Sequence, residues 1–410
     1  MSLYAINTIH HTEGLEGWTV QTALQLSKRG GVEAEVVRPK TGLSGIRIRE
    51  VRGITVHELP SLMVGPRNGF NRRLVEFTPS LPRYLLKRAD AQRRLGYRPV
   101  LFLHEYRSYN SYNILRRVSG NVPTIAQHHG TYPTFLKFLF RLKRPRKLIH
   151  RVSPVYYFLK AQLENERERR IFSKVRLFRV LNGLEQFYLS KILKLKGIVA
   201  IGTMGVDLDE IDAVEKDKMR LREELGLPRD KDVLIYLGNI PDLSKGSDLI
   251  PRIIHELNKK RKVLMVMAGF IKDRRFAGYA RSQGILVFDR LPHRAALKYL
   301  AAADAYILPA RSVYYFGGIG VAALEAMALN VPVVSPTLIH LPEISNIESV
   351  GLHVPWCDDD EGLKNFIEVT NSVLDGGCRF NGREVIEKYF SWGIIARSLV
   401  RDLGDLSGQG

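Results

Sequence analysis

The sequence predicts an α/β protein made of two doubly wound domains, each built on a parallel sheet. The length of 410 residues suffices for two to three domains with separate cores. Short apolar runs alternate with helical segments in both halves of the chain, which is typical of parallel sheets with crossover helices. A glycine turn that leads into an apolar helix, within residues 317–334, is typical of a site for phosphate and ribose.

The first half of the chain contains the expected strands of one domain. A glycine-containing loop, residues 14–17, follows the first strand and leads into a helix that runs to Lys28. The strands are expected at Leu3 to Ile9, Ala34 to Val37, Pro99 to Leu103, Val122 to Ala126 and Gly197 to Ile201. We place the end of this domain at Asp207, so that it covers residues 1–207.

The second half repeats the pattern after a charged helix that is expected from Asp209 to Leu225. Its strands are expected at Val233 to Leu237, Lys262 to Met267, Ile285 to Phe288, Ala305 to Leu308, Val331 to Val334 and Leu352 to Val354. This second domain is expected to cover residues 208–385. Ligands of such open sheets bind beyond the carboxyl ends of the strands, so two domains facing each other would form a binding cleft.

The glycine turn of the second domain suggests which ligand binds there. Backbone amides of Gly318, Ile319 and Gly320 lie at the expected start of a helix, where unpaired N–H groups and the helix dipole favour an anion. Glu325 is the only charged residue between Gly317 and Pro342 and sits among apolar residues, so it needs partners such as ribose hydroxyls. The alternative is an ordinary strand-to-helix turn in which Glu325 bonds to local backbone.

Composition excludes several classes of protein. The longest apolar runs are shorter than the roughly 18 residues of a membrane-spanning helix, and the N-terminus lacks the basic and apolar regions of a secretory signal. The two cysteines, Cys357 and Cys378, have no histidine or cysteine cluster near them, so neither a disulfide framework nor a zinc site is expected. We therefore expect a soluble protein of the cytoplasm.

Positive charge is concentrated in one segment of the chain. Residues 137–196 contain 17 lysine and arginine residues and four glutamates, a surplus of 13 out of the net charge of +20. The segment is also rich in Phe, Tyr and Leu, and a basic surface with large apolar groups suits an anionic membrane face. Nucleic acid is a less favoured partner. In a third interpretation the aromatic residues are core and the cations form a solvated face.

Several motifs, in order along the chain, resemble those of glycosyltransferase family 4. They are Gly14-Leu15-Glu16 with Lys28-Arg29-Gly30, Pro123 to Gly130 with its His128-His129 pair, Gly205-Val206-Asp207 with Met204 in place of an Asn, Leu237-Gly238-Asn239 with Lys245-Gly246, and Phe390-Ser391-Trp392. The resemblance implies a GT-B fold, in which two domains face each other across a cleft. It also implies a last helix, residues 386–410, that crosses back to the first domain.

The resemblance further implies an enzyme that transfers a hexosyl group from a UDP- or GDP-sugar with retention of configuration. The acceptor hydroxyl would belong to a glycan or a lipid-linked molecule. No metal and no cofactor are expected. A protein with the basic segment described above would be cytoplasmic, with peripheral attachment to the inner face of the membrane.

The resemblance assigns roles to particular residues. Lys245 is expected to hold the β-phosphate of the departing diphosphate, and Glu325 the ribose. The amides of residues 318–320 are expected to meet phosphate or sugar oxygens, and Gly14 to approach the donor from the first domain. His129 is expected to contact the transferred sugar near its reacting carbon.

Two positions depart from the family pattern. Gly317 stands where the first glutamate of the E-x7-E motif is usual, and Asn239 stands where an arginine contacts the donor diphosphate. Arg311, in the loop before the glycine turn, is a candidate for replacing that cation. These departures leave open a protein that binds nucleotide sugar without transferring it. Two further alternatives are an epimerase or phosphorylase of the same fold and a basic nucleic-acid binder.

Overall fold

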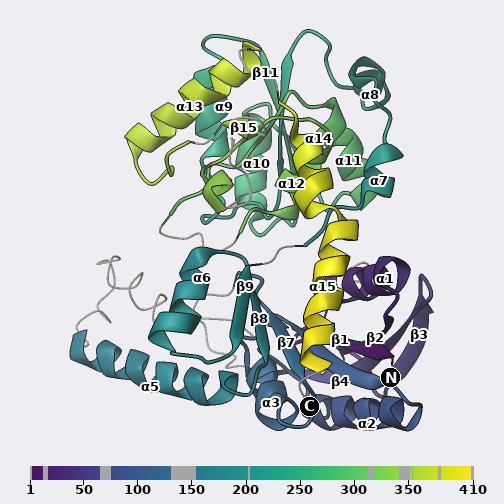
Figure 1. Cartoon of the computed structure of the whole chain (residues 1–410). Helices are drawn as coiled ribbons and strands as arrows, with labels where there is room; N and C mark the ends of the chain where they lie inside the picture. Colours follow the sequence, from purple (N-terminus) through teal and green to yellow (C-terminus); the bar gives the residue numbers. More distant parts are fainter. Residues whose placement is uncertain are drawn as a thin grey trace. The chain divides into compact units, whose positions relative to one another are not determined.

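The computed structural model describes residues 2–12, 17–64, 75–130, 154–201, 204–312, 318–340, 351–352, 354–376 and 380–407 (Figure 1). The chain divides into two compact units. One consists of Met1–Thr203 together with Ile395–Gly410, and the other of Met204–Ile394. Each unit has its own sheet and its own buried apolar core.

The sheet of the first unit is mainly parallel, and its strand order changes direction at the first strand. The described strands run in the order β3-β4-β2-β1-β6-β7-β8-β9, where β1 is Leu3–Ile9, β2 Glu33–Thr41, β6 Arg98–His104, β7 Thr124–Gln127, β8 Leu177–Val180 and β9 Ile198–Ile201. The helices are α1 (Trp18–Gly30), α2 (Leu81–Arg94), α3 (Tyr109–Arg117), α5 (Pro154–Phe172) and α6 (Gly183–Phe187), with a π-helical turn η2 (Tyr188–Ile192). Because β1 pairs with both β2 and β6, the loops after β1 and β6 leave the sheet at its switch point.

A hairpin extends this sheet at a place where no strand was expected. Strands β3 (Arg47–Val51) and β4 (Ile54–Val64) are antiparallel, and the turn between them uses Arg52 and Gly53 with φ of 53° and 81°. Strand β4 also pairs in parallel with β2, and β5 (Val75–Phe77) pairs antiparallel with β4. Most of β3 is exposed and polar, so it lacks the apolar run that identifies a buried strand.

The second unit is an all-parallel sheet of described order β12-β11-β10-β13-β14-β15. These strands are β10 (Asp232–Leu237), β11 (Val263–Gly269), β12 (Leu286–Asp289), β13 (Ala305–Ile307), β14 (Val333–Val334) and β15 (Gly351–Leu352). The helices include α9 (Ile250–Leu257), α10 (Arg274–Ser282), α11 (His293–Ala302), α12 (Val321–Ala328), α13 (Asp360–Leu374) and α14 (Gly382–Val385), followed by the turns of η5 (Ile386–Phe390). Numbered within the unit, the strand order is 3-2-1-4-5-6, so the switch point lies between β10 and β13.

The expectation of one charged helix from Asp209 to Leu225 is wrong. The structure has two short helices, α7 (Leu208–Asp212) and α8 (Lys218–Glu224). Asp217 caps the second helix by accepting hydrogen bonds from the backbone N–H groups of Met219 and Arg220, at 2.9 and 3.1 Å. An aspartate in this position favours a helix start over a helix interior, which explains the break.

The last helix, α15 (Trp392–Ser407), begins in the second unit, and its residues from Ile395 onward belong to the first. Arg179 in β8 forms a buried ion pair with Asp402 of this helix. The fold class predicted from the sequence, α/β with two doubly wound parallel-sheet domains, is confirmed.

Candidate functional site

The switch point of the second unit brings together two loops that carry predicted donor-site residues. Asn239 and Lys245 follow β10, and Arg311 follows β13, which is its neighbour in the sheet. The loops touch, because Arg311 donates hydrogen bonds from its backbone N–H to Ser244 O at 3.1 Å and from Nη1 to Leu243 O at 3.0 Å. Asn239, Lys245 and Arg311, which were predicted from the sequence, therefore lie at one edge of the sheet.

The loop after β10 packs so closely on the loop after β13 that it requires a glycine. Gly246 has φ of 67°, and a Cβ atom there would lie 1.7 Å from the carbonyl oxygen of Pro309. This contact fixes the backbone directly beside Lys245. The close packing of the two backbones therefore requires glycine at position 246, in addition to any role of this residue in binding.

Lys245 is partly buried, and no carboxylate lies within ion-pairing distance of it among the residues that the structure describes. The nearby Asp242 is already engaged: its Oδ1 accepts from the backbone N–H and hydroxyl of Ser244, at 3.1 and 2.6 Å, and its Oδ2 from Lys272 Nζ at 2.9 Å. Burial lowers the pKa of Lys245, with Lys272 adding to this effect and Asp242 opposing it. Such an ammonium favours a bound anion.

Asp242 organises the loop that carries Lys245. Burial alone would raise the pKa of this carboxyl, but hydrogen bonds from Ser244 and Lys272 lower it to about 2. Asn239 also donates to its Oδ2, at 3.4 Å. The carboxylate is therefore ionised at neutral pH. It links Asn239 and Ser244 of this loop to Lys272, which follows β11.

Arg311 forms a bidentate ion pair inside the second unit. Its Nη1 and Nη2 donate to Asp248 Oδ1 and Oδ2, at 2.7 and 2.8 Å, and the side chain is only 15% exposed. In this structure the guanidinium braces the loop that carries Lys245. Its expected role as a replacement for the diphosphate-binding arginine stays a prediction.

The glycine turn leads into α12 as expected. Gly320 is the N-cap of this helix, in an extended conformation, and no side chain caps it. Ile319 is buried in the core of the second unit. Gly318 also belongs to the described part of the turn, whereas Gly317 and Gly14 lie outside the described residues.

Glu325 on α12 is buried and has a partner that the sequence analysis did not select. Its Oε1 lies 2.7 Å from Nε2 of His293, the first residue of α11. The other ring nitrogen of His293, Nδ1, lies 2.9 Å from Oε2 of Glu210 on α7. The hydrogen bond to Glu325 raises the pKa of His293 to about 9, although burial opposes it. The isolated Glu325 in an apolar helix was the signal that such a partner exists.

His129 lies beyond the carboxyl end of β7 in the first unit, as predicted. It stacks on Trp18 at a ring distance of 4.0 Å, and its Nε2 lies 3.2 Å from Nδ1 of His104 at the end of β6. The neighbouring His128 is fully buried near Tyr106, so His129 is the more accessible of the pair. Trp18 and His104 were not selected from the sequence.

His129, His104 and the nearby His10 are uncharged at neutral pH because their pKa values are lowered. Burial, and then the neighbouring imidazoles of His104 and His128, hold the pKa of His129 well below its usual value. Burial also lowers the pKa of His104 to about 3 and that of His10 to about 4. A neutral imidazole at this edge can donate one hydrogen bond and accept another.

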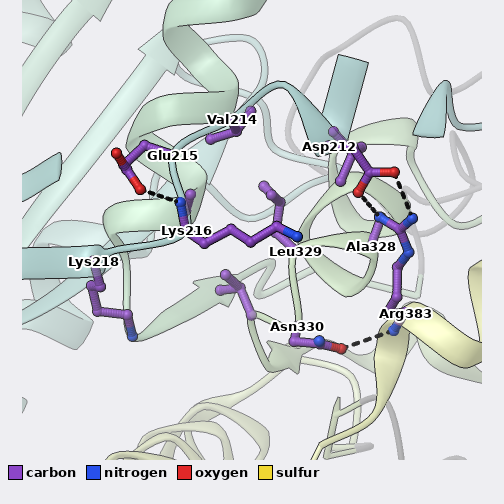
Figure 2. Close-up of a pocket in the computed structure, with 12 residues that line it drawn as sticks. Asp212, Val214, Glu215, Lys216, Lys218, Ala328, Leu329, Asn330 and Arg383 are labelled. Carbon is purple, nitrogen blue, oxygen red and sulfur yellow. Dashed lines mark hydrogen bonds and ion pairs between the residues drawn. The ribbon is translucent and has the colours of Figure 1, made fainter. Parts of the chain in front are cut away.

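A separate cavity of about 500 Å³ lies at the C-terminal end of α12 (Figure 2). None of the predicted site residues lines it. Arg383 forms a bidentate pair with Asp212, at 2.8 and 2.9 Å, and its backbone N–H donates to Asn330 Oδ1 at 2.9 Å. These contacts join α7, α12 and α14 and are explained by the packing of the unit.

Two further properties concern the described part of the chain. It contains no group of three or more His, Cys, Asp or Glu residues arranged to hold a metal ion. Within the same residues, every helix is too short or too polar to cross a membrane.

A known family model matches part of the second unit. Residues 231–371 match the family model described as "Glycosyl transferases group 1". The match runs from β10 into α13 and contains Asn239, Lys245, Arg311 and Glu325.

Curated proteins with similar sequences are glycosyltransferases. A D-inositol 3-phosphate glycosyltransferase of Mycobacteroides abscessus is 27% identical over 95% of this chain and 84% of its own length. A GDP-mannose-dependent monoacylated alpha-(1-6)-phosphatidylinositol monomannoside mannosyltransferase of Corynebacterium glutamicum is 28% identical over 48% of this chain and 54% of its own. The putative teichuronic acid biosynthesis glycosyltransferase TuaC of Bacillus subtilis is 30% identical over 32% of this chain, which spans about a third (31%) of its length.

Solved structures share the fold. Sucrose-phosphate synthase from Thermosynechococcus elongatus superposes with a TM-score of 0.69 at 18% identity, over all of both chains. An E. coli protein described as trehalose-6-phosphate bound with UDP-2-fluoro glucose gives a TM-score of 0.64 at 12% identity, over 97% of this chain and 98% of its own. The protein therefore has the GT-B fold.

Proposed function

We propose that the protein is a retaining glycosyltransferase that moves a hexosyl group from a UDP- or GDP-sugar to an acceptor hydroxyl. The observation that carries this proposal is the state of Lys245. Its ammonium lies at the switch point of the unit that matches the group 1 glycosyltransferase model, without a carboxylate partner among the described residues, while Asp242 is held by Lys272 and Ser244. A bound diphosphate suits the position of Lys245 at the switch point of the sheet, and its negative charge pairs with the ammonium.

The donor is proposed to bind along the carboxyl edge of the second sheet. Lys245 holds the β-phosphate, and the amides of residues 318–320 at the start of α12 contact phosphate or sugar oxygens. Glu325 accepts hydrogen bonds from the ribose. Lys272, whose side chain is 44% exposed, adds positive charge close to the same diphosphate.

Departure of the nucleoside diphosphate creates negative charge on the leaving oxygen. Preorganised cations and amides at that oxygen lower the barrier, because they act where charge develops. We assign this task to Lys245 and the glycine turn, and expect transfer to continue in the presence of a metal chelator. The acceptor hydroxyl attacks from the face of the leaving group, and the departing phosphate takes its proton.

His129 is proposed to contact the transferred sugar. Its low pKa supports this role, since a neutral imidazole places no positive charge beside a reacting carbon that itself becomes positive. Stacking on Trp18 and the contact with His104 fix the orientation of the ring. We propose Gly14 as a further donor contact because of its motif alone, since it lies outside the described residues.

A lipid-linked or glycan acceptor and peripheral attachment to an anionic membrane are proposed from the basic segment. Residues 137–153 lie outside the described residues, but α5, α6 and η2 carry large exposed apolar side chains beside cations. These are Phe158, Leu159, Leu163, Leu184, Phe187 and Ile192, of which Leu163 is the most exposed at 73%. The mannosyltransferase relative, whose name includes a phosphatidylinositol mannoside, supports a lipid acceptor. We therefore propose the inner face of the cytoplasmic membrane as its location.

The transfer assay uses radiolabelled UDP- and GDP-sugars with a membrane lipid extract and, separately, a glycan mixture. Incorporation of label into either acceptor fraction is the expected result, and absence of incorporation from every donor contradicts the proposal.

A protein that only binds nucleotide sugar is the second candidate, because Gly317 and Asn239 replace two residues of the family motif. Donor binding without transfer would favour it, and release of free sugar or an epimerised donor would favour a phosphorylase or an epimerase.

A further inference from the structure

We propose that His293 is a positioning residue for the donor ribose: it holds the carboxylate of Glu325 in place through one ring nitrogen and is itself anchored by Glu210 through the other. This inference rests on the proposed function, which assigns the ribose to Glu325. His293 and Glu210 belong to helices α11 and α7, which pack together with α12 in the second unit (Figure 1).

The geometry requires a protonated ring. Nε2 lies 2.7 Å from Glu325 Oε1 and Nδ1 lies 2.9 Å from Glu210 Oε2, and carboxylates only accept hydrogen bonds. A neutral imidazole has one N–H and serves only one of them, whereas an imidazolium serves both. The pKa of about 9, raised mainly by Glu325 and further by Glu210, agrees with this geometry. Both carboxylates that face His293 lie on helices other than α11: Glu325 on α12 and Glu210 on α7.

The stability of α11 does not explain the arrangement. His293 is the first residue of that helix, where the dipole favours negative and disfavours positive charge. A cation in this position is held by the two carboxylates. It joins α7 to the middle of α12, where Glu325 is the single carboxylate.

The arrangement leaves one oxygen of Glu325 for a ligand. Oε1 is used by His293, and Oε2 accepts no hydrogen bond within the described part of the chain, while the side chain keeps 11% exposure. Two glutamates and one imidazolium sum to one negative charge. A group that accepts hydrogen bonds and carries negative charge suits sugar hydroxyls and repels phosphate. The diphosphate is thereby directed to Lys245.

The test is calorimetry of UDP and GDP binding, each compared with its 2′-deoxy and 3′-deoxy analogue. Wild-type protein is expected to prefer the ribonucleotide. In His293→Ala this preference falls about tenfold, the size of one charged hydrogen bond, whereas His255→Ala on the exposed face of α9 leaves it unchanged. Equal losses for ribose and deoxyribose nucleotides would overturn the proposal, because a merely structural role weakens all ligands alike.

A double-mutant cycle shows whether His293 acts through Glu325. His293→Ala is expected to add no further loss in a Glu325→Gln background, and full additivity contradicts the proposal. Glu210→Gln, which keeps a hydrogen-bonding group, should reproduce part of the loss and covers the case in which His293→Ala fails to fold. Wild-type ribose preference should also fall as pH rises through about 9 and His293 loses its proton.

The binding measurements distinguish a failure of the proposed function from a failure of the role of His293 alone. If neither nucleotide binds to wild-type protein, the proposed function fails and this inference with it. If the nucleotides bind but His293→Ala keeps the full ribose preference, only this inference fails.

Discussion

At the scale of single residues, the loop after β10 is governed by one carboxylate. Asp242 accepts hydrogen bonds from Ser244 and Lys272 and leaves the Lys245 ammonium without a described carboxylate partner. The loop thus separates two tasks: one carboxylate fixes the backbone, and one ammonium stays ready for an anion. Removing Asp242 should therefore affect stability in a pH-dependent manner.

We predict that the stabilising effect of Asp242 is lost in acid. Its pKa is about 2 in the folded state and about 3.8 without the fold, so its contribution is complete above pH 3.8 and disappears as pH falls toward 2. The difference in unfolding free energy between wild type and Asp242→Asn should shrink by roughly 2 kcal/mol between pH 5 and pH 2. Denaturant titrations at several pH values measure it, and a constant difference would refute the assignment.

The candidate site residues that belong to continuous motifs could be proposed from the sequence, whereas the residues that contact them from elsewhere in the chain could not. Asn239 and Lys245 stand beside glycines in the loop after β10, and Glu325 stands in the helix that follows the glycine turn. His293 and Lys272 were missed because their partners, Glu325 and Asp242, are 32 and 30 residues away in sequence. Such pairings depend on strand order, which no local pattern encodes.

At the scale of elements, the contact between the loops after β10 and β13 depends on a glycine without a side chain. Gly246 and Gly226 have nearly the same left-handed conformation, with φ of 67° and 65°. A Cβ atom at Gly246 would lie 1.7 Å from Pro309 O, whereas nothing lies within 4 Å of one at Gly226. The two positions therefore separate backbone strain from packing.

We predict that Gly246→Ala destabilises the second unit far more than Gly226→Ala. Both changes cost about 1 to 2 kcal/mol for the left-handed conformation, and Gly246→Ala adds the clash with Pro309, at least about 1 to 3 kcal/mol. Urea unfolding of both variants provides the comparison. Equal destabilisation would show that the two loops are not held as tightly as described.

Most elements of both sheets could be predicted because buried parallel strands are continuous apolar runs. The runs at Val233 to Leu237 and Lys262 to Met267 correspond closely to β10 and β11. The hairpin of β3 and β4 was missed because β3 is polar and exposed. The break between α7 and α8 was missed because a charged, helix-favouring sequence hid the cap at Asp217.

At the scale of the whole molecule, the uneven charge predicts binding to anionic membranes. Leu163 on α5 and Leu95 at the end of α2 are similarly exposed, at 73% and 70%, and only Leu163 lies in the basic segment. Retention on vesicles with phosphatidylglycerol should fall several-fold for Leu163→Glu and remain close to wild type for Leu95→Glu. Salt should weaken wild-type retention, since the attraction is partly electrostatic. Failure of wild-type protein to bind at low salt would instead favour a soluble acceptor.

The most direct test of the central claim is calorimetric titration of the folded protein with a panel of UDP- and GDP-sugars. We predict a saturable heat with at least one donor. Lys245→Met should weaken this binding ten- to a hundredfold, as expected for a lost charged hydrogen bond. The control Lys259→Met, which removes an exposed ion pair just after α9, should leave the binding unchanged. Absence of heat from every donor, or full affinity in Lys245→Met, would contradict the account.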